Sequence, residues 1–372
     1  MPLQHKRLKL ICVTSGRSDV FIWLPVWRAI ARNPKFELWI ARTGMHISAG
    51  GKININKLVD ANIIDVGFDL GGNKPEQASE AMAESAADFC RFFNEIKPDA
   101  LFVLGDRMDM LPAVFASLPF NIICIHLHGG EISEGAIDDR IRHAVSMMSS
   151  IHFVAHSEAK AVIEGFGKKS STVYVVGAPG LDNIKSCPFI SKEDLLTELG
   201  VSKYKDFFVG TVHSETNSNN PVRPLLETLK AIEKFSECET IFTHSNSDPC
   251  NMVINDLLQK ADNDIPHFHF FPSLRYEQYV NLMRHSVAVI GNSSSGLIEA
   301  PFLKKRALNI GARQWGRVAD KHVRHCSNES EKIFAALVKL FSEKNCDKIS
   351  SSSIYGNGNA SEKIEKILAG LF

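Results

Sequence analysis

Residues 125–144 read IHLHGGEISEGAIDDRIRHA, and the rest of the chain can be interpreted outward from this stretch. It holds three histidines, four carboxylates, two arginines and three glycines. Burying so many titratable groups without partners would be costly, so the stretch predicts a functional loop. The apolar run at 121–125 predicts a buried strand before it, and a helix is expected to leave it at Asp138. The cluster is therefore expected at the carboxyl end of a strand, where open α/β sheets bind their ligands.

The same alternation of strand and helix extends outward from this stretch. Apolar runs at 8–14 and 100–104 predict earlier strands, and apolar residues at helical spacing predict a long amphipathic helix over 76–97. Strands and helices continue to alternate after the stretch, and a second series runs from 206 to 341. This alternation predicts an α/β protein with parallel, doubly wound sheets.

The chain of 372 residues is too long for one ordinary domain. Residues 178–191 are rich in Gly, Pro and Ser, interrupt the alternation and predict a linker. We expect an N-terminal Rossmann-like domain over residues 1–177 and a C-terminal one over 192–349. A final loop and helix, residues 350–372, are expected to pack back towards the N-terminal domain.

The composition limits the classes of partner. Lys plus Arg and Asp plus Glu both number 42, so no global charge attracts nucleic acid or an anionic membrane. The apolar runs are too short for a signal peptide or a membrane span. The eight cysteines form no CxxC pair, which is typical of a reduced intracellular protein without a zinc knuckle. These features predict a cytoplasmic protein without nucleic-acid or membrane partners.

The motif Gly105-Asp106-Arg107 follows a predicted strand. An acid at that place faces the ligand-binding edge of the sheet, and Arg107 can clamp a phosphate with two hydrogen bonds. A structural ion pair at a strand end is the alternative reading.

The opening stretch allows two kinds of chemistry. Its HxH pattern with nearby acids is compatible with a metal site, as in a metal-dependent phosphoesterase. A metal-free site would use Glu131 and Asp138 as general base and acid. Asp139 is a weaker catalytic candidate. Asp138 or Asp139 can instead simply cap the following helix. Arg142 and His143 can serve as buried structural partners.

The loop Gly291-Asn292-Ser293-Ser294-Ser295-Gly296 joins a predicted strand to a helix. Backbone N–H groups and serine hydroxyls there predict a phosphate cradle, although no lysine follows as in a Walker A loop. Glu299 can accept two ribose hydroxyl hydrogens, or simply complement the helix dipole. The alternative for the whole loop is an ordinary polar connection.

Polar residues after other strands are further candidates. Arg17 offers a phosphate cation in the first loop, and His213 and Asn246 follow two strands of the second series. Arg313, in GARQWGR, is another candidate cation. A lone histidine is more often a packed side chain than a ligand, so the position of His213 carries its functional reading.

Several motifs together resemble those of the hydrolysing UDP-N-acetylglucosamine 2-epimerases of bacterial sialic-acid pathways, and the epimerase half of the bifunctional animal enzyme. The matching pieces, in family order over nearly the whole chain, are SGRSD, TGMH, GDRMDMLPA, HLHGGEISEGAIDDRIRHA, VGAPGLD, IGNSSSGLIE and NIGARQWGR. The resemblance implies a GT-B-like fold: two Rossmann-type, doubly wound parallel-sheet domains with an interdomain cleft, UDP being held mainly by the second. It also implies a homodimer or homotetramer.

The resemblance implies a two-step reaction without metal or other cofactor. UDP leaves as a base removes the C2 proton, and water then adds to the 2-acetamidoglucal to release N-acetylmannosamine. The implied acid–base residues are Asp106, Glu131 and Asp138, while His213 and Arg17 hold or protonate the departing diphosphate. The implied binding residues are Ser293 and Ser294 for phosphate, Glu299 for ribose, Arg313 as an assisting group, and His46, Arg107, His143 and Asn246 at other motif positions.

Two departures from the family pattern leave the sugar open. Val20, Phe21 and Ile22 stand where the family often has a small hydroxyl residue, and Met252 replaces a usual basic residue. UDP-2,4-diacetamido-2,4,6-trideoxyglucose, a precursor of legionaminic acid, is the alternative substrate. Outside this class, a metallophosphoesterase and a non-catalytic nucleotide-sugar sensor remain as alternatives.

Overall fold

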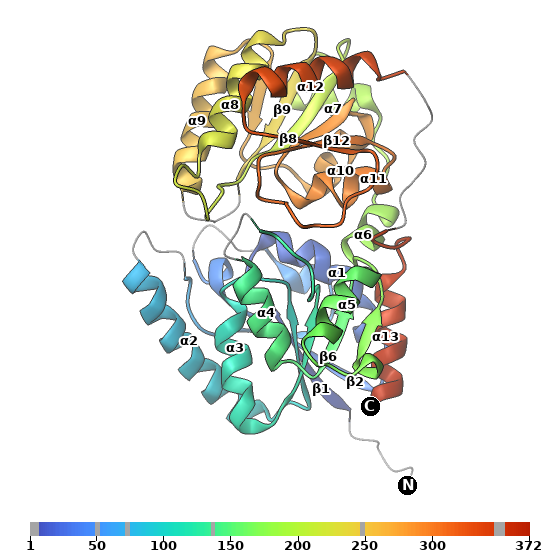
Figure 1. Ribbon diagram of the computed structural model, residues 1–372. Helices are drawn as coiled ribbons and strands as arrows, with labels where there is room; N and C mark the ends of the chain where they lie inside the picture. Colours follow the sequence, from blue (N-terminus) through green and yellow to red (C-terminus); the bar gives the residue numbers. More distant parts are fainter. Residues whose placement is uncertain (1–6, 49–52, 71–74, 135–137, 246–249, 346–353) are drawn as a thin grey trace. The chain divides into compact units, whose positions relative to one another are not determined.

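The computed structural model describes residues 7–48, 53–70, 75–134, 138–245, 250–345 and 354–372 (Figure 1). The chain divides into two compact units. Unit 1 comprises residues 1–131, 138–185 and 354–372, and unit 2 comprises residues 132–137 and 186–353. The C-terminal segment thus belongs to the same unit as the N-terminus.

Unit 1 contains a seven-stranded parallel sheet in the order β3-β2-β1-β4-β5-β6-β7. The strands are β1 (Leu8–Thr14), β2 (Phe36–Arg42), β3 (Asn62–Asp65), β4 (Ala100–Leu104), β5 (Ile123–Leu127), β6 (Ile151–Val154) and β7 (Val173–Val175). The α-helices are α1 (Arg17–Arg32), α2 (Pro75–Ile96), α3 (Met110–Ser117), α4 (Asp138–Met148), α5 (Ser157–Gly165), α6 (Gly180–Ser186), which ends at the unit boundary, and α13 (Ala360–Leu371).

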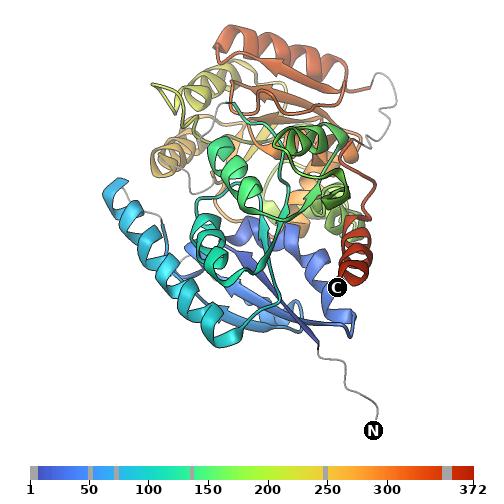
Figure 2. The same ribbon diagram turned by 60° about the horizontal axis from the view of Figure 1, so that its bottom comes forward.

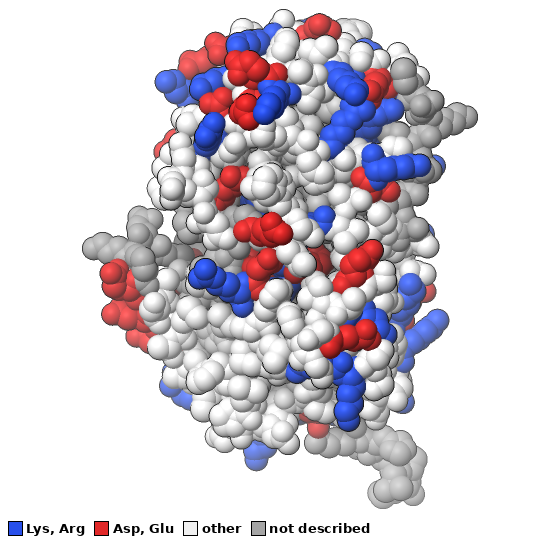
Figure 3. Space-filling model, viewed as in Figure 1, with Lys and Arg blue, Asp and Glu red and all other residues white. Residues whose placement is uncertain are grey.

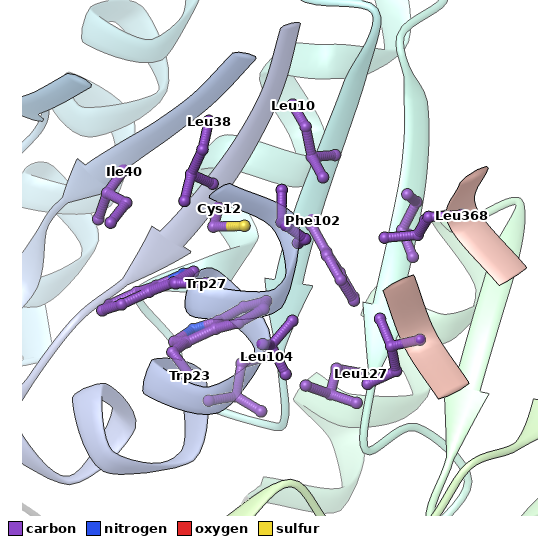
Figure 4. Packing of buried hydrophobic residues seen from close by; sticks show 14 of the residues in the cluster. Leu10, Cys12, Trp23, Trp27, Leu38, Ile40, Phe102, Leu104, Leu127 and Leu368 are labelled. Atoms are coloured by element: carbon purple, nitrogen blue, oxygen red, sulfur yellow. The ribbon is translucent and has the colours of Figure 1, made fainter. Parts of the chain in front are cut away.

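Both faces of this sheet are buried, which explains why its central strands are almost continuously apolar. Leu10 and Cys12 of β1 project into a core cluster with Trp23 and Trp27 of α1 (Figure 4). The two indole rings stack with centroids 5.9 Å apart. Leu368 of α13 joins the same cluster, so α13 packs beside α1, as Figures 1 and 2 show.

The alternate residues of β1 form the core on the opposite face. Ile11 and Val13 pack there with Phe89 and Phe93 of α2 and with Val145 of α4. The sheet therefore carries helices on both faces, as a doubly wound sheet must.

Unit 2 contains a six-stranded parallel sheet in the order β10-β9-β8-β11-β12-β13. Its strands are β8 (Phe207–Thr211), β9 (Glu239–Thr243), β10 (Phe268–Phe271), β11 (Ala288–Gly291), β12 (Arg306–Ile310) and β13 (Val323–Cys326). Its α-helices are α7 (Lys192–Leu199), α8 (Arg223–Lys234), α9 (Asn251–Asp264), α10 (Tyr276–His285), α11 (Glu299–Phe302) and α12 (Ser330–Ser342).

Both sheets follow the Rossmann strand order, in which the chain reverses its direction of winding beside the first strand. This confirms the expected pair of doubly wound, Rossmann-type parallel sheets. The reversal falls between β1 and β4 in unit 1 and between β8 and β11 in unit 2. Ligands of such sheets bind outside the carboxyl ends of the strands at this point.

A few elements differ from the sequence-based expectation. The segment 178–191 contains helix α6, and helix α7 and strand β13 were not predicted. Helix α7 has clear local signals, because the Ser191 hydroxyl accepts the Asp194 N–H and Gly200 ends the helix in the left-handed conformation. β13 is a four-residue strand at the edge of the sheet, too short for a period-2 pattern to reveal.

At least one face of the molecule carries mixed charge. On the face shown in Figure 3, Lys and Arg side chains are interspersed with Asp and Glu side chains. Of the helices in the described ranges, none combines the length and the apolar character needed to cross a bilayer. Because the chain has no net charge, a charged ligand would be held by local groups.

Helix α13 is expected to be a structural part of unit 1. Leu368 is fully buried, so Leu368→Ala should lower the free energy of unfolding by about 3 kcal/mol through lost apolar contact and the cavity left behind. Urea denaturation followed by circular dichroism measures this as a lower midpoint. Lys366→Ala, at an exposed position of the same helix, is the control and should leave the midpoint unchanged. Equal midpoints for both variants would contradict the packing described.

Candidate active site

The end of β4 places an acid at the edge of the unit 1 sheet. All five residues of β4 are buried, and Gly105 then turns with a φ of +70°, which favours glycine. The Gly105 N–H donates to the Leu127 carbonyl at 2.8 Å, so the turn is fastened to the end of β5. Asp106 consequently begins the loop with a partly exposed carboxylate.

The end of β5 is shaped by a tight loop through His128, Gly129 and Gly130. Gly130 has a φ of +77°, and a Cβ there would lie 2.2 Å from the Ala159 carbonyl oxygen. His128 also has a positive φ, +62°, which is unfavourable for a residue with a side chain. This backbone places Glu131 at 2% exposure, with its Oε1 2.9 Å from the Nδ1 of His128.

Arg142 of α4 organises the carboxylates around this loop. Its side chain is 1% exposed, and its Nη1 donates to Asp139 Oδ1 at 2.6 Å and to the Glu131 carbonyl oxygen at 2.7 Å. Its Nη2 donates to the carboxylate of Asp106. Asp138 opens α4, where the helix dipole favours a negative charge. One buried guanidinium therefore joins the end of β4, the loop after β5 and the start of α4.

His126 provides a neutral support beneath this cluster. Its Nε2 lies 2.8 Å from the Gly105 carbonyl oxygen, which can only accept, so Nε2 carries the proton. Its Nδ1 then accepts from the Ser146 hydroxyl at 2.9 Å. Burial lowers the pKa of His126 to about 3, so the ring is neutral near pH 7 and acts as a structural link between β5, the Gly105 turn and α4.

The other candidates of unit 1 occupy different positions. His46 is buried after β2, with its Nε2 3.2 Å from the Thr14 hydroxyl at the end of β1, and Arg107 Nε lies 3.3 Å from Asp109. Arg17 begins α1 at an exposed position. His143 follows Arg142 on α4 and therefore points about 100° away from it. Its ring packs edge-on against Phe166 with centroids 5.0 Å apart.

Asn292 is the centre of the polar groups in unit 2. Its side chain is fully buried; its Oδ1 accepts the His213 N–H at 2.7 Å and its Nδ2 donates to the His213 carbonyl at 2.9 Å. These two hydrogen bonds fix the backbone of His213 beyond the end of β8. The His213 ring makes a further hydrogen bond between its Nδ1 and the Ser245 hydroxyl at 3.2 Å.

The same asparagine links to the loop after β12. Its carbonyl oxygen accepts from Arg313 Nη1 at 3.4 Å and from Gln314 Nε2 at 3.0 Å. Glu215 accepts the backbone N–H groups of Ala312 and Arg313 and fixes that loop. His213 and Arg313 are thus both held by Asn292, His213 through the asparagine side chain and Arg313 through the asparagine backbone carbonyl oxygen.

The serine loop is supported from α10. The Ser293 hydroxyl accepts the Ser295 N–H, and Tyr279 of α10 lies close to the hydroxyls of Ser295 and Thr211. Burial raises the pKa of Tyr279 to about 12, so the phenol remains a hydrogen-bond donor. Ser294 begins a single 3₁₀ turn, and Glu299 begins α11. Asn246 lies outside the described residues.

Each unit thus gathers its candidates at the carboxyl edge of its own sheet. The candidate residues of unit 1 include titratable acids, whereas those of unit 2 are mainly hydrogen-bond donors around a neutral asparagine. Within the described ranges, no group of three or more His, Cys, Asp and Glu side chains is arranged to hold a metal ion. The roles of Asn292 and Glu215 were missed from sequence, although Asn292 lies in the serine loop and Glu215 stands two residues after His213.

The sequence of this chain is similar to those of known sugar-nucleotide 2-epimerases. A family model described as UDP-N-acetylglucosamine 2-epimerase matches residues 28–369. The chain is 31% identical to the GDP/UDP-N,N'-diacetylbacillosamine 2-epimerase (hydrolyzing) of Campylobacter jejuni, over 90% of this chain and 88% of that protein. It is 33% identical to polysialic acid biosynthesis protein P7 of Escherichia coli, over 93% of this chain and 89% of that protein.

A solved structure shares the fold. The UDP-GlcNAc 2-epimerase from Neisseria meningitidis bound to UDP-GlcNAc superposes with a TM-score of 0.81 at 18% identity. The match covers 98% of this chain and all of that chain. This likeness confirms the GT-B-like architecture of two parallel-sheet α/β domains.

Arg142 is expected to be needed for the fold of this site. Arg142→Met keeps much of the side-chain volume but leaves Asp106 and Asp139 without their shared cation, so unfolding should become easier by roughly 3 kcal/mol. Chemical denaturation measures the loss. Arg140→Met, two residues earlier on an exposed position of α4, is the matched control and should change the midpoint little. A wild-type midpoint for Arg142→Met would show that the buried guanidinium does not hold the carboxylates.

Proposed function

The chain belongs to the UDP-N-acetylglucosamine 2-epimerase family, and we propose that it is a hydrolysing 2-epimerase that converts UDP-GlcNAc and water into N-acetylmannosamine and UDP. The product would supply the biosynthesis of sialic acid or a related nonulosonic acid. The observation that carries the proposal is the set of carboxylates around Arg142, because proton transfer at carbon needs acids and bases held in fixed positions.

The proposed first step is an elimination. Glu131, buried and hydrogen-bonded by His128, is the proposed base that removes the C2 proton of the sugar. The electron pair of that C–H bond forms the C1–C2 double bond as the bond from C1 to the UDP oxygen breaks. The products of this step are UDP and 2-acetamidoglucal.

The proposed second step is a hydration. Water adds at C1, and a proton returns to C2 on the opposite face, which gives N-acetylmannosamine. Asp106 and Asp138 are the proposed partners of Glu131 in moving these protons. The link from Arg142 to Asp106, Asp139 and the Glu131 backbone supports this assignment, because it fixes the relative positions of the three segments that carry these acids.

The leaving group requires positive charge and hydrogen-bond donors. His213, fixed by Asn292, is proposed to hold or protonate the departing diphosphate together with Arg17. Ser293 and Ser294 are proposed to bind phosphate, Glu299 the ribose, and Arg313 to assist. The remaining proposed binding residues are His46, Arg107, His143 and Asn246.

A second substrate is favoured by the names of two relatives. Besides the Campylobacter jejuni protein, a UDP-N,N'-diacetylbacillosamine 2-epimerase (hydrolyzing) of Legionella pneumophila is 29% identical over 97% of this chain and 95% of that protein. We therefore keep UDP-2,4-diacetamido-2,4,6-trideoxyglucose, with the same chemistry at C1 and C2, as the second candidate. We further propose that the enzyme is cytoplasmic, works as a homodimer or homotetramer, and needs no cofactor.

Product analysis by NMR tests the proposal. Purified protein is incubated in D₂O with UDP-GlcNAc and with the diacetamido 6-deoxy analogue in parallel. We expect UDP and N-acetylmannosamine carrying deuterium at C2, because the second step takes its proton from solvent. Preferential turnover of the analogue would instead assign the second substrate.

Three outcomes would exclude the proposed reaction. A product without deuterium at C2 would exclude elimination and hydration. Binding of UDP-GlcNAc without turnover of either compound would indicate a nucleotide-sugar sensor. Phosphate-ester hydrolysis that chelation abolishes would indicate a metallophosphoesterase.

Glu131→Gln tests the proposed base. The amide keeps the shape of the side chain but cannot accept the C2 proton, so kcat should fall at least ~100-fold while UDP affinity is retained. Steady-state kinetics and isothermal titration with UDP measure the two quantities. Glu134→Gln, at an exposed glutamate of the same sequence stretch, should keep wild-type kinetics. Wild-type kcat in Glu131→Gln would remove Glu131 from the catalytic residues.

A further inference from the structure

His156 lies at the carboxyl end of β6 and caps the first turn of α5. Its Nδ1 accepts the Ala159 N–H at 3.2 Å. The Glu158 carboxylate is also 3.2 Å from Nδ1, but that side chain is exposed and accepts a hydrogen bond from the Ser157 hydroxyl. Ala159 is fully buried, so its N–H depends on the Nδ1 lone pair. The neutral ring therefore carries its proton on Nε2.

That Nε2–H is an unusual group for a helix cap. His156 is 5% exposed, and within the described part of the chain its Nε2 is buried without a hydrogen-bond partner. Leaving a buried donor unbonded costs about 1–3 kcal/mol. Ser or Thr would cap the helix with a single hydroxyl and bury no second polar side-chain atom. Capping alone therefore does not explain a histidine at this position.

The surroundings of the ring connect it to Glu131. The Gly130 backbone packs against the Ala159 carbonyl on the first turn of α5, so the loop that carries Glu131 lies against the helix that His156 caps. Tyr355 closes another side, with its ring edge-on to His156 at a centroid distance of 5.1 Å. Burial lowers the pKa of His156, while the negative charges of Glu131 and then Glu158 oppose that shift and His128 adds to it.

We propose that His156 is a positioning residue for Glu131, whose Nε2–H donates to the Glu131 carboxylate as the loop reaches its reacting geometry. His128 already holds Oε1 of that carboxylate at 2.9 Å, so two imidazoles would fix its orientation. The Nε2–H of His156, which has no partner among the residues that the structure describes, is then the donor that binds the Glu131 carboxylate during the reaction. This inference rests on the proposed role of Glu131 as the base.

Two substitutions separate positioning from capping. His156→Asn supplies an amide oxygen that can cap α5 as Nδ1 does, but it has no group at the Nε2 position. His156→Gln reaches farther and can place an N–H near Nε2. We expect His156→Asn to lower kcat about 10-fold, as loss of a supporting hydrogen bond typically does, with KM and the unfolding midpoint unchanged. His156→Gln should restore part of kcat.

The pH profile and an NMR titration provide the decisive measurements. Loss of the donor should raise the pKa of Glu131 by roughly one unit, which moves the acid limb of kcat/KM to higher pH. The groups facing His156 are Glu158 of its own helix, Glu131 and His128 of the loop after β5, and Tyr355. Glu158→Gln is the control and should leave both the acid limb and kcat unchanged.

The carboxyl ¹³C titration of Glu131, assigned with Glu131→Gln and recorded with saturating UDP so that the loop is in its ligand-bound geometry, needs no turnover. It therefore tests the positioning even if wild-type protein turns over neither nucleotide sugar, which would refute the proposed function alone. A higher Glu131 pKa in His156→Asn than in wild type supports the proposal. An unchanged Glu131 titration, with or without a loss of activity, overturns it.

Discussion

The site of unit 1 depends on the burial of one guanidinium. Arg142 cannot lose its charge at ordinary pH, so a position with 1% exposure is tolerable only if anions and carbonyl oxygens surround it. Asp106, Asp139 and the Glu131 carbonyl meet that requirement. Asp139 lies on α4 itself, while Asp106 and the Glu131 carbonyl belong to the loops after β4 and β5, which are thereby held against α4. The electrostatic requirement of one residue thus gives a group of loops a defined geometry.

In unit 2 the neutral side chain of Asn292 takes a comparable organising place. Asn292 can donate and accept at the same time, and it uses both abilities on the backbone of His213. Its carbonyl oxygen then takes hydrogen bonds from Arg313 and Gln314. Because Asn292 is neutral, it holds His213 and Arg313 without adding charge to this part of unit 2. The two units therefore differ in electrostatics as their proposed tasks differ.

The sequence predicted those parts of the molecule that depend on local pattern. The strands, most helices and the parallel doubly wound sheets follow from apolar periodicity, because both faces of each sheet are buried. Positions at strand ends, such as Asp106 and His213, follow from the same reasoning. The sequence indicated Arg142 only as a possible buried structural partner. Its bond to Asp106 and the bonds of Asn292 to His213 could not be predicted, because these partners lie 36 and 79 residues away. The buried Nε2–H of His156 could likewise not be predicted from the sequence, because burial and tautomer are properties of the folded chain.

The loop after β5 illustrates how strain and function are related in this fold. Positive φ angles occur at both His128 and Gly130, yet only the second position has the residue that such a backbone favours. Glycine at 128 would relieve the unfavourable backbone but would also remove the imidazole that holds Glu131 Oε1. The strain is retained because the hydrogen bond it permits fixes a buried carboxylate. Strained non-glycine residues concentrate at functional sites for this reason, and here the strained residue adjoins the proposed base.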